Sequence, residues 1–364
     1  MTGCPPSVAA SADTVAALAR RLAERLSRPR TLMEVCGGQT HSLLRWGLDQ
    51  LLPPGLRLNH GPGCPVCVTP AATIDDAIAL ARTPGVILCT YGDMARVPGT
   101  RPGLDLLAAR AAGGEVRLLT SPLDALALAR GAPDHQVVFL AVGFETTAPA
   151  TALLARQVKA LGLCNLSLLA AHVRVAPAME AILADPANTV EAFLAAGHVC
   201  GVLGTAELEA LVARFQVPVV VTGFAPEELL AGLSQAVDLL EAGQARVANA
   251  YGRVVRPEGN PAARALLEEV FQPVDQVWRG LGPIPGGGLA LRPPYDALDA
   301  RRRFALPLPE EPREPVCISG AVLRGRATPD QCAAFGTRCT PDHSLGAPMV
   351  SSEGACAAWH RYRR

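Results

Sequence analysis

Cysteine is the residue type that most clearly marks chemistry in this chain, which contains eleven cysteines among 364 residues. Two of them, Cys64 and Cys67, lie in the stretch 59–68, where two glycines and two prolines favour a turn over a regular helix or strand. A Cys-x-x-Cys pair outside a disulfide framework indicates redox or metal chemistry. Because the thiolate is the reactive form, the pair could form a reversible disulfide, bind a soft metal ion, or alternate between the two.

A third cysteine, Cys36, lies in a second glycine-containing loop. We expect the two loops to meet, so that Cys36, Cys64 and Cys67 face one another. The residues after Cys36 are predicted to be helical, and the positive end of a helix dipole favours a thiolate. His41, five residues further on, could accept a proton or orient a ligand. His60 could do the same in the central turn, although either histidine could equally be an ordinary hydrogen-bonded residue.

Most of the other cysteines fall into two kinds. Cys89 and Cys200 adjoin apolar runs and are predicted to be small buried hydrophobic residues. Four more crowd into the last 48 residues, and only nine of the 58 residues 307–364 are Val, Leu, Ile, Met or Phe. This segment has too few apolar residues for a core of its own, so a metal site could hold it together. The four are Cys317, Cys332, Cys339 and Cys356.

Zinc and a [4Fe–4S] cluster are both compatible with four thiolates. Zinc sites usually take ligands from short Cys-x-x-Cys knuckles, and the C-terminal segment has none. Its cysteines are separated by 14, 6 and 16 residues, a spacing that suits a larger cluster bound by separate loops. We therefore favour an iron–sulfur cluster, with zinc and unligated thiols as the alternatives.

Alternating apolar strands and helices predict an α/β fold with two units of similar size, each with a parallel sheet covered on both faces. The apolar run Val137–Val142 is typical of a strand buried on both sides. We expect a helix at 188–195 and a strand at 199–203, and mixed structure over 246–306. The predicted domains are 1–133, with the Cys36 and Cys64/Cys67 loops, 134–255, the second α/β unit, and 256–364, the C-terminal region.

The loop after the strand 137–142 contains Glu145, Thr146 and Thr147. Ligands collect at the carboxyl ends of strands in open α/β sheets, so these residues could bind one. Alternatively, Thr146 or Thr147 caps the next helix and Glu145 complements its dipole. No G-x-G-x-x-G or Walker A sequence occurs, so nucleotide binding has no support from a motif.

Composition argues against two classes of partner. The net charge is zero, which gives no electrostatic reason to expect nucleic acid or an anionic membrane surface as a partner. No apolar run reaches the ~18 residues of a membrane span, and the N-terminus does not resemble an export signal. We therefore expect a cytoplasmic protein.

With these residues assembled, the sequence resembles the HypD family of [NiFe]-hydrogenase maturation factors. The similarity runs over nearly the whole chain in the family's order, through several long and unusual motifs. The stretches that carry it are 33–41 (MEVCGGQTH), 59–68 (NHGPGCPVCV), 143–149 (GFETTAP), 197–199 (GHV), 258–260 (EGN), 278–280 (WRG) and 332–356, which ends in MVSSEGAC.

The resemblance implies two Rossmann-like α/β units plus a small cysteine-rich iron–sulfur cluster domain. It also implies a scaffold on which the Fe(CN)2CO group of the hydrogenase is assembled. Cys36 would bind the Fe(II), Cys64 and Cys67 would be the redox-active dithiol, and the four C-terminal cysteines would hold a [4Fe–4S] cluster that supplies electrons. The implied partners are a HypC-type chaperone with a second thiolate, HypE with HypF as the source of cyanide, and the hydrogenase large subunit through the chaperone.

One residue departs from the family pattern, because Gln39 stands where histidine is common. Glutamine cannot titrate, so any general-base role must fall to His41 or to another residue. Two rival functions share the same cysteines. One is a cluster-driven thiol–disulfide oxidoreductase without iron cargo, and the other is a zinc-stabilised interaction scaffold without redox chemistry.

Overall fold

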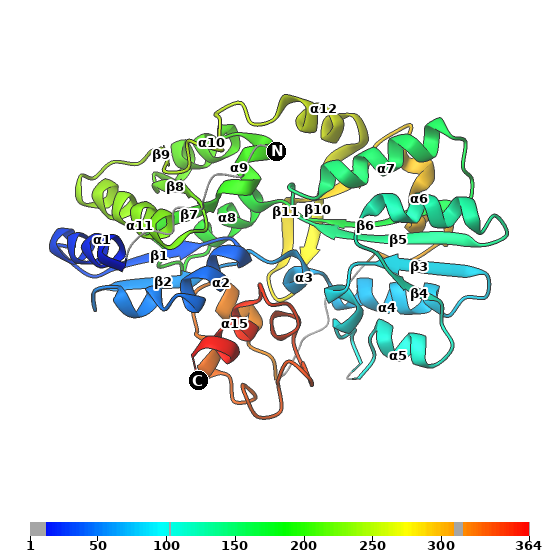
Figure 1. Ribbon diagram of the computed structural model, residues 1–364, viewed down its shortest axis with the longest axis horizontal. Helices are drawn as coiled ribbons and strands as arrows, with labels where there is room; N and C mark the ends of the chain where they lie inside the picture. The colour runs from blue at the N-terminus through cyan, green and yellow to red at the C-terminus, as the bar shows by residue number, and fades with distance from the viewer. Residues whose placement is uncertain (1–11, 102, 309–315, 364) are drawn as a thin grey trace, which may run out of the picture.

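Two parallel β-sheets lie side by side in the computed structural model, which describes residues 12–101, 103–308 and 316–363 (Figure 1). Helices cover both sheets, an antiparallel hairpin lies between the two halves, and the C-terminal segment lies below their junction (Figure 1). The predicted mixed α/β class with parallel sheets is therefore confirmed. None of the helices in the described residues is long and apolar enough to cross a membrane.

The first sheet has the strand order β2-β1-β7-β8-β9, with parallel pairing throughout. Its strands are β1 (Arg30–Glu34), β2 (Leu56–His60), β7 (Ala192–Ala196), β8 (Val219–Thr222) and β9 (Val247–Asn249). The helices around it are α1 (Ala12–Arg25), α2 (Gly37–Arg45), α8 (Val175–Leu183), α9 (Gly197–Leu203), α10 (Ala206–Phe215) and α11 (Pro226–Glu241). Leu194 of β7 packs with α1, α2 and α11, whereas its neighbour Phe193 packs with α8, α9 and α10. Both faces of the sheet are thus buried.

The second sheet has the order β4-β3-β5-β6 and is also parallel. Its strands are β3 (Val86–Thr90), β4 (Val116–Leu118), β5 (Gln136–Gly143) and β6 (Leu166–His172). Its helices are α4 (Ala71–Ala81), α5 (Leu106–Ala111), α6 (Pro122–Gly131), α7 (Ala148–Ala160) and α12 (Pro261–Val270). In β5, Phe139 faces the core formed with α6 and α7, and Leu140 faces the core formed with α4 and α5. This double burial explains the uninterrupted apolar run of β5.

Neither sheet is built from one continuous part of the chain. Strand β1 pairs with both β2 and β7, although β7 follows β1 by more than a hundred residues in the sequence, and β3 pairs with β5. A boundary at 133/134 therefore falls between strands of the same sheet. Hydrogen bonding thus joins strands that sequence order separates, and the domain ranges 1–133, 134–255 and 256–364 stay predictions.

The stretch 188–203 was assigned incorrectly from the sequence. The structure has a strand, β7, at Ala192–Ala196, where a helix is expected, and a helix, α9, at Gly197–Leu203, where a strand is expected. Alanine favours helices in isolation, but β7 is buried in the centre of its sheet and tertiary packing overrides that propensity. Gly204, with φ of 82°, ends α9.

The hairpin and the C-terminal segment complete the molecule. The hairpin consists of β10 (Phe271–Trp278) and β11 (Gly282–Leu291), within the region expected to be mixed. Shorter helices are α3 (Pro65–Val68), α13 (Ala300–Arg303), α14 (Ser319–Leu323) and α15 (Ala355–Tyr362). Helix α15 packs against α2, so the end of the chain covers the region of Cys36 (Figure 1).

Candidate functional site

The strand order of the first sheet reverses between β1 and β7, because β2 lies on the far side of β1 and β8 on the far side of β7. Open parallel sheets bind ligands in the crevice at the carboxyl ends of the strands, where the order reverses. Cys36 follows β1, and His198 lies in α9 directly after β7. The topology therefore places these two side chains at the position where such a sheet binds ligands.

Cys36 faces His198 across this crevice. Its Sγ atom lies 3.9 Å from both Nδ1 and Nε2 of the imidazole. The His198 ring stacks on Phe224, with 5.0 Å between ring centroids. Burial lowers the pKa of His198, so the ring is neutral at pH 7 and can accept a proton.

The thiol of Cys36 is buried, with 3% of the residue exposed, at the N-cap position of α2. Burial raises its pKa, while the backbone N–H groups of Gln39 and Gly38 act in the opposite direction and the charge of Glu34 adds to the increase. Burial is the largest of these effects. The thiol therefore stays protonated at neutral pH until a cation approaches, and a coordinating metal ion removes the thiol proton.

Glu34, the last residue of β1, fixes this loop. One carboxylate oxygen accepts a hydrogen bond from the backbone N–H of Cys36 at 2.9 Å. The other contacts Nδ1 of His60 at 2.7 Å and accepts a hydrogen bond from the hydroxyl of Thr40. Glu34 is fully buried, and a buried carboxylate needs such a set of donors. The carboxylate thus ties the Cys36 loop, α2 and the central turn together.

The Cys36 loop and the central turn are in direct contact, as expected from the sequence. The backbone N–H of Gly37 donates to the carbonyl of Gly63 at 2.8 Å, and the N–H of Gly61 donates to the carbonyl of Glu34 at 2.8 Å. A Cβ atom on Gly63 would lie 2.2 Å from the backbone nitrogen of Cys36. Only glycine therefore permits this close approach of the two backbones.

Cys64 and Cys67 are joined by a disulfide bond, with 5.3 Å between their Cα atoms. Cys64 caps the short helix α3, which begins at Pro65 and includes Cys67. The prolines of the stretch therefore do not exclude helix, because Pro65 lies in the first turn, where its missing N–H costs nothing. Both cysteines are buried.

His41 and Gln39 lie on opposite sides of α2. His41 is not in contact with Cys36 in any interaction we find, and its ring nitrogens instead contact the carbonyl of Ser352 and the hydroxyl of Tyr362, each at 3.3 Å. Gln39 is buried, and its amide nitrogen donates to the carbonyl of Ala195 at 3.2 Å, at the end of β7. Gln39 therefore anchors α2 to the first sheet, and its Oε1 has no hydrogen-bond partner in the described part of the chain.

The four C-terminal cysteines lie near one another. Burial raises the pKa of Cys356, and the charges of the other three thiols raise it further, so all four are within electrostatic range. Three of them border a small apolar cluster that includes Met349 and Ala357. Across residues 12–101, 103–308 and 316–363, no group of three or more His, Cys, Asp or Glu side chains is arranged to hold a metal ion. The structure thus shows the proximity of these thiols but no separate cluster domain.

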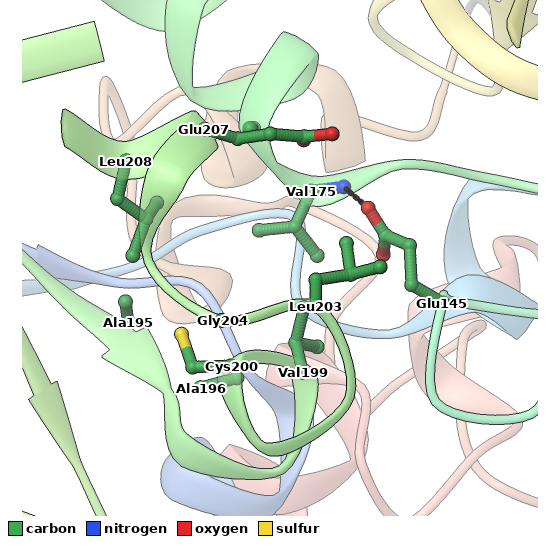
Figure 2. Close-up of a pocket in the computed structure, with 11 residues that line it drawn as sticks. Glu145, Val175, Ala195, Ala196, Val199, Cys200, Leu203, Gly204, Glu207 and Leu208 are labelled. Atoms are coloured by element: carbon green, nitrogen blue, oxygen red, sulfur yellow. Dashed lines mark hydrogen bonds between the residues drawn. The ribbon is translucent and has the colours of Figure 1, made fainter. Parts of the chain in front are cut away.

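Glu145 follows β5 and lies apart from the hydrogen bonds around Cys36. It is buried, and one of its oxygens accepts a hydrogen bond from the N–H of Val175 at 3.0 Å, while Oε2 has no partner among residues 12–101, 103–308 and 316–363 (Figure 2). Burial raises the pKa of Glu145 to about 7. The residue borders a cavity of about 20 Å³, which is room for one water molecule, together with Cys200 (Figure 2).

The two threonines beside Glu145 make no capping hydrogen bond. Thr147 occupies the N-cap position of α7, but its hydroxyl donates to the carbonyl of Phe144 at 3.2 Å. Thr146 is partly buried and Thr147 is exposed. The threonine cap considered from the sequence is therefore not found, and neither threonine contacts the Cys36 site in the interactions we find among the described residues.

Sequence reasoning did not single out Glu34 or His198 as site residues. Glu34 precedes Cys36 by two positions, but its role depends on Thr40 and His60, which only the folded chain brings to it. His198 follows β7, where the sequence predicts a helix. It could therefore not be predicted to lie at the carboxyl end of a strand. The motif at 197–199 was the one available signal.

Known proteins resemble this chain over almost its full length. Residues 11–363 match the HypD family, described as the hydrogenase formation hypA family. The hydrogenase maturation factor HypD of Azotobacter vinelandii is 47% identical over 360 residues, covering 96% of this chain and 95% of that protein. The HypD of Escherichia coli is 44% identical, covering 95% and 92%, and that of Cupriavidus necator is 41% identical, covering 95% of each. The chain therefore belongs to the HypD family of hydrogenase maturation factors.

Proposed function

We propose that this maturation factor is a scaffold on which one Fe(II) ion is held and converted to the Fe(CN)2CO group of a [NiFe]-hydrogenase. The observation that carries the proposal is the buried thiol of Cys36, at the ligand-binding edge of the first sheet and facing His198. Soft thiolates bind iron well. The iron is the cargo, to be passed on with its diatomic ligands.

Binding of iron requires Cys36 to lose its proton. The imidazole of His198 is neutral and 3.9 Å from Sγ, so it can take this proton as the thiolate forms. Glu34 holds the Cys36 backbone during the exchange through its bond to the N–H group. A cysteine of a HypC-type chaperone would be the second thiolate, which leaves positions on the iron for cyanide and carbon monoxide.

The pair Cys64 and Cys67 would deliver electrons for cyanide transfer. In the dithiol state, the two thiols lose two electrons and two protons and form the disulfide seen in the structure. The electrons break the sulfur–carbon bond of a thiocyanate on a cysteine of HypE, which receives its cyanide group through HypF. The sulfur leaves as a thiol and the carbon as hydrogen cyanide, which binds iron as cyanide after losing its proton.

The C-terminal thiols fit a [4Fe–4S] cluster by their chemistry. The four thiols are within electrostatic range of one another, and three of them border a thin apolar core, as expected for a metal-nucleated segment. We propose Cys317, Cys332, Cys339 and Cys356 as its ligands, and the cluster would supply reducing equivalents. A brown protein with a reducible cluster signal after anaerobic purification supports this assignment, whereas a colourless zinc protein contradicts it.

The remaining parts of the proposal concern partners and location. The relatives named above are hydrogenase maturation factors. We therefore expect this protein to act together with other maturation proteins. We propose HypC, HypE with HypF, and the hydrogenase large subunit as partners in the cytoplasm, with no nucleic acid or membrane involved. The protein would act as an iron-binding redox scaffold.

The test is the Cys36→Ala variant, purified anaerobically in complex with its chaperone. We expect the infrared bands of iron-bound cyanide and carbon monoxide to disappear, with iron content reduced accordingly. The matched control is Cys164→Ala, since Cys164 is exposed and lies before β6, in the second sheet. Wild-type bands in Cys36→Ala would contradict the proposal.

The disulfide Cys64–Cys67 specifically favours one second candidate, a thiol–disulfide oxidoreductase without iron cargo. It predicts turnover of a disulfide substrate and no cyanide bands in the wild-type protein. The same infrared measurement on the wild type therefore separates the two functions.

A further inference from the structure

An open groove with a volume of about 190 Å³ lies between α10, α12 and the hairpin, outside the cysteine loops. Apolar side chains form much of its wall, among them Leu203, Leu267 and Phe271. Two polar side chains of the groove, Glu145 and Arg292, have buried atoms without a hydrogen-bond partner. Buried polar atoms of native proteins normally have partners, so these two atoms are candidates to hold a polar ligand.

Glu145 is 2% exposed and presents one uncommitted oxygen. Its other oxygen is held by the N–H of Val175 at the first turn of α8, which fixes the carboxyl group (Figure 2). Glu145 borders both the groove and the smaller cavity beside Cys200. The carboxyl group of Glu145 therefore belongs to the wall of the groove.

Arg292 follows β11 and contributes the uncommitted cation. Its Nε–H is buried without a partner, and no ion pair of its guanidinium is found among the described residues. The other arginines of the groove are committed: Arg174 pairs with Glu207 at 2.6 Å, and Arg264 lies 3.7 Å from Glu268. The guanidinium of Arg292 therefore belongs to the groove wall without a partner among the described residues.

We propose that this groove binds a small carboxylate with an apolar body. The two carboxylate oxygens accept hydrogen bonds from the fork of Arg292, and one of them also accepts a hydrogen bond from the carboxyl group of Glu145. The apolar body lies against Leu203, Leu267 and Phe271. A single uncommitted guanidinium matches a single negative charge, so a phosphate dianion is the poorer ligand.

The protonation of Glu145 makes this binding depend on pH. Burial and the charge of Glu207 raise its pKa, the Val175 N–H and Arg174 act in the opposite direction, and the result is about 7. Below that pH the carboxyl group donates a hydrogen bond to the ligand. Above it the carboxylate repels the ligand, so affinity falls about tenfold for each further pH unit.

The test is calorimetric titration of the full-length protein with sodium butyrate, at pH values below and above 7. We expect saturable binding at the lower pH and weaker binding at the higher pH. Glu145→Gln should bind at both, because its amide donates a hydrogen bond without titrating. Arg292→Gln should weaken binding at least tenfold, and Arg264→Gln, on the same groove but already paired, should change it less than threefold.

Several outcomes would overturn the proposal: no saturable binding, unchanged affinity in Arg292→Gln, or equal displacement of butyrate by inorganic phosphate. Arg292→Lys keeps the charge without the fork and should still weaken binding, which separates lost recognition from a failure of Arg292→Gln to fold. None of the residues that line the groove is a proposed iron ligand. Failure of this test would therefore leave the iron assignment unaffected, and failure of the iron assignment would leave the carboxylate site unaffected.

Discussion

The two cysteine regions of the molecule are built in different ways. Around Cys36, the folded chain itself fixes the position of the loops. The carboxylate of Glu34 binds three hydrogen-bond donors, and Gly63 allows the backbones of the two loops to come into contact. A disulfide closes the adjacent turn. Around Cys356, a few apolar residues and four neighbouring thiols are gathered in a segment with little core.

The difference teaches where each region obtains its stability. The Cys36 region is part of the hydrophobic core of the first sheet, with Met33, Val35 and Val68 packed beside it. Its shape is set by this packing, so the proposed iron would bind there without refolding of the chain. The C-terminal region has little core, so its proposed cluster would contribute much of its stability, as a permanent cofactor does. The two regions touch, since a Cβ atom on Gly37 would lie 2.5 Å from Glu353.

The largest effect that separates the regions should come from Cys356→Ser. Structural metal binding contributes on the order of 10 kcal/mol to a thin-cored segment, and the loss of one ligand removes much of it. In hydrogen exchange, we expect protection to disappear over residues 316–349 and to persist in β1 and β7. Cys164→Ser is the matched control. Unchanged protection of the C-terminal segment would show that it is stable without a bound group.

A smaller loss of stability is expected from Gly63→Ala, which changes the contact between the Cys36 loop and the central turn. The new Cβ atom would meet backbone atoms of Cys36 at 2.2 to 2.6 Å, and backbone cannot move as cheaply as a side chain. We expect a loss of about 3 kcal/mol in the free energy of unfolding, measured with urea. Gly131→Ala, with no atom within 4 Å of its new Cβ, should change it by less than about 0.5 kcal/mol. Equal effects of the two substitutions would disprove the close packing of the loops.

Glu34→Gln should have the smallest effect of the three. The amide replaces one carboxylate oxygen, so either Cys36 or the pair Thr40 and His60 loses its acceptor. A hydrogen bond to a buried charge is worth about 2 kcal/mol, and we expect a loss of that size. The reduced protein should also alkylate faster at Cys36, as measured by mass spectrometry. The exposed Glu24→Gln is the control, and identical behaviour of both variants would remove Glu34 from the site.

Much of the fold could be predicted because pattern and environment agree. The apolar run Val137–Val142, expected to be a strand buried on both sides, lies within β5. The hairpin was missed because Pro273 and Pro283 and a run of glycines hide its strand pattern. The alanine-rich β7 was missed because its burial, not its propensity, decides its structure.

The sequence predicts the cysteines of the candidate site but not the residues that position them. Cys36 and the Cys64/Cys67 turn can be recognised from the sequence by their cysteines and the spacing of these. Their two loops are in contact in the structure, as predicted. Glu34 and His198 have no such signature, since each acts through partners brought together by the sheet topology. The reversal of strand order between β1 and β7, which sets the position of the crevice, is a property of the sheet and not of any one segment.

One measurement tests the central claim, that two separate sulfur sites hold iron for different purposes. Mössbauer spectroscopy of the iron-enriched, anaerobically prepared complex distinguishes low-spin cargo iron from a [4Fe–4S] cluster. We expect Cys36→Ala to lose the low-spin component alone and Cys356→Ser to lose the cluster component. Joint loss of both components in Cys36→Ala, or survival of the low-spin component in that variant, would contradict the claim.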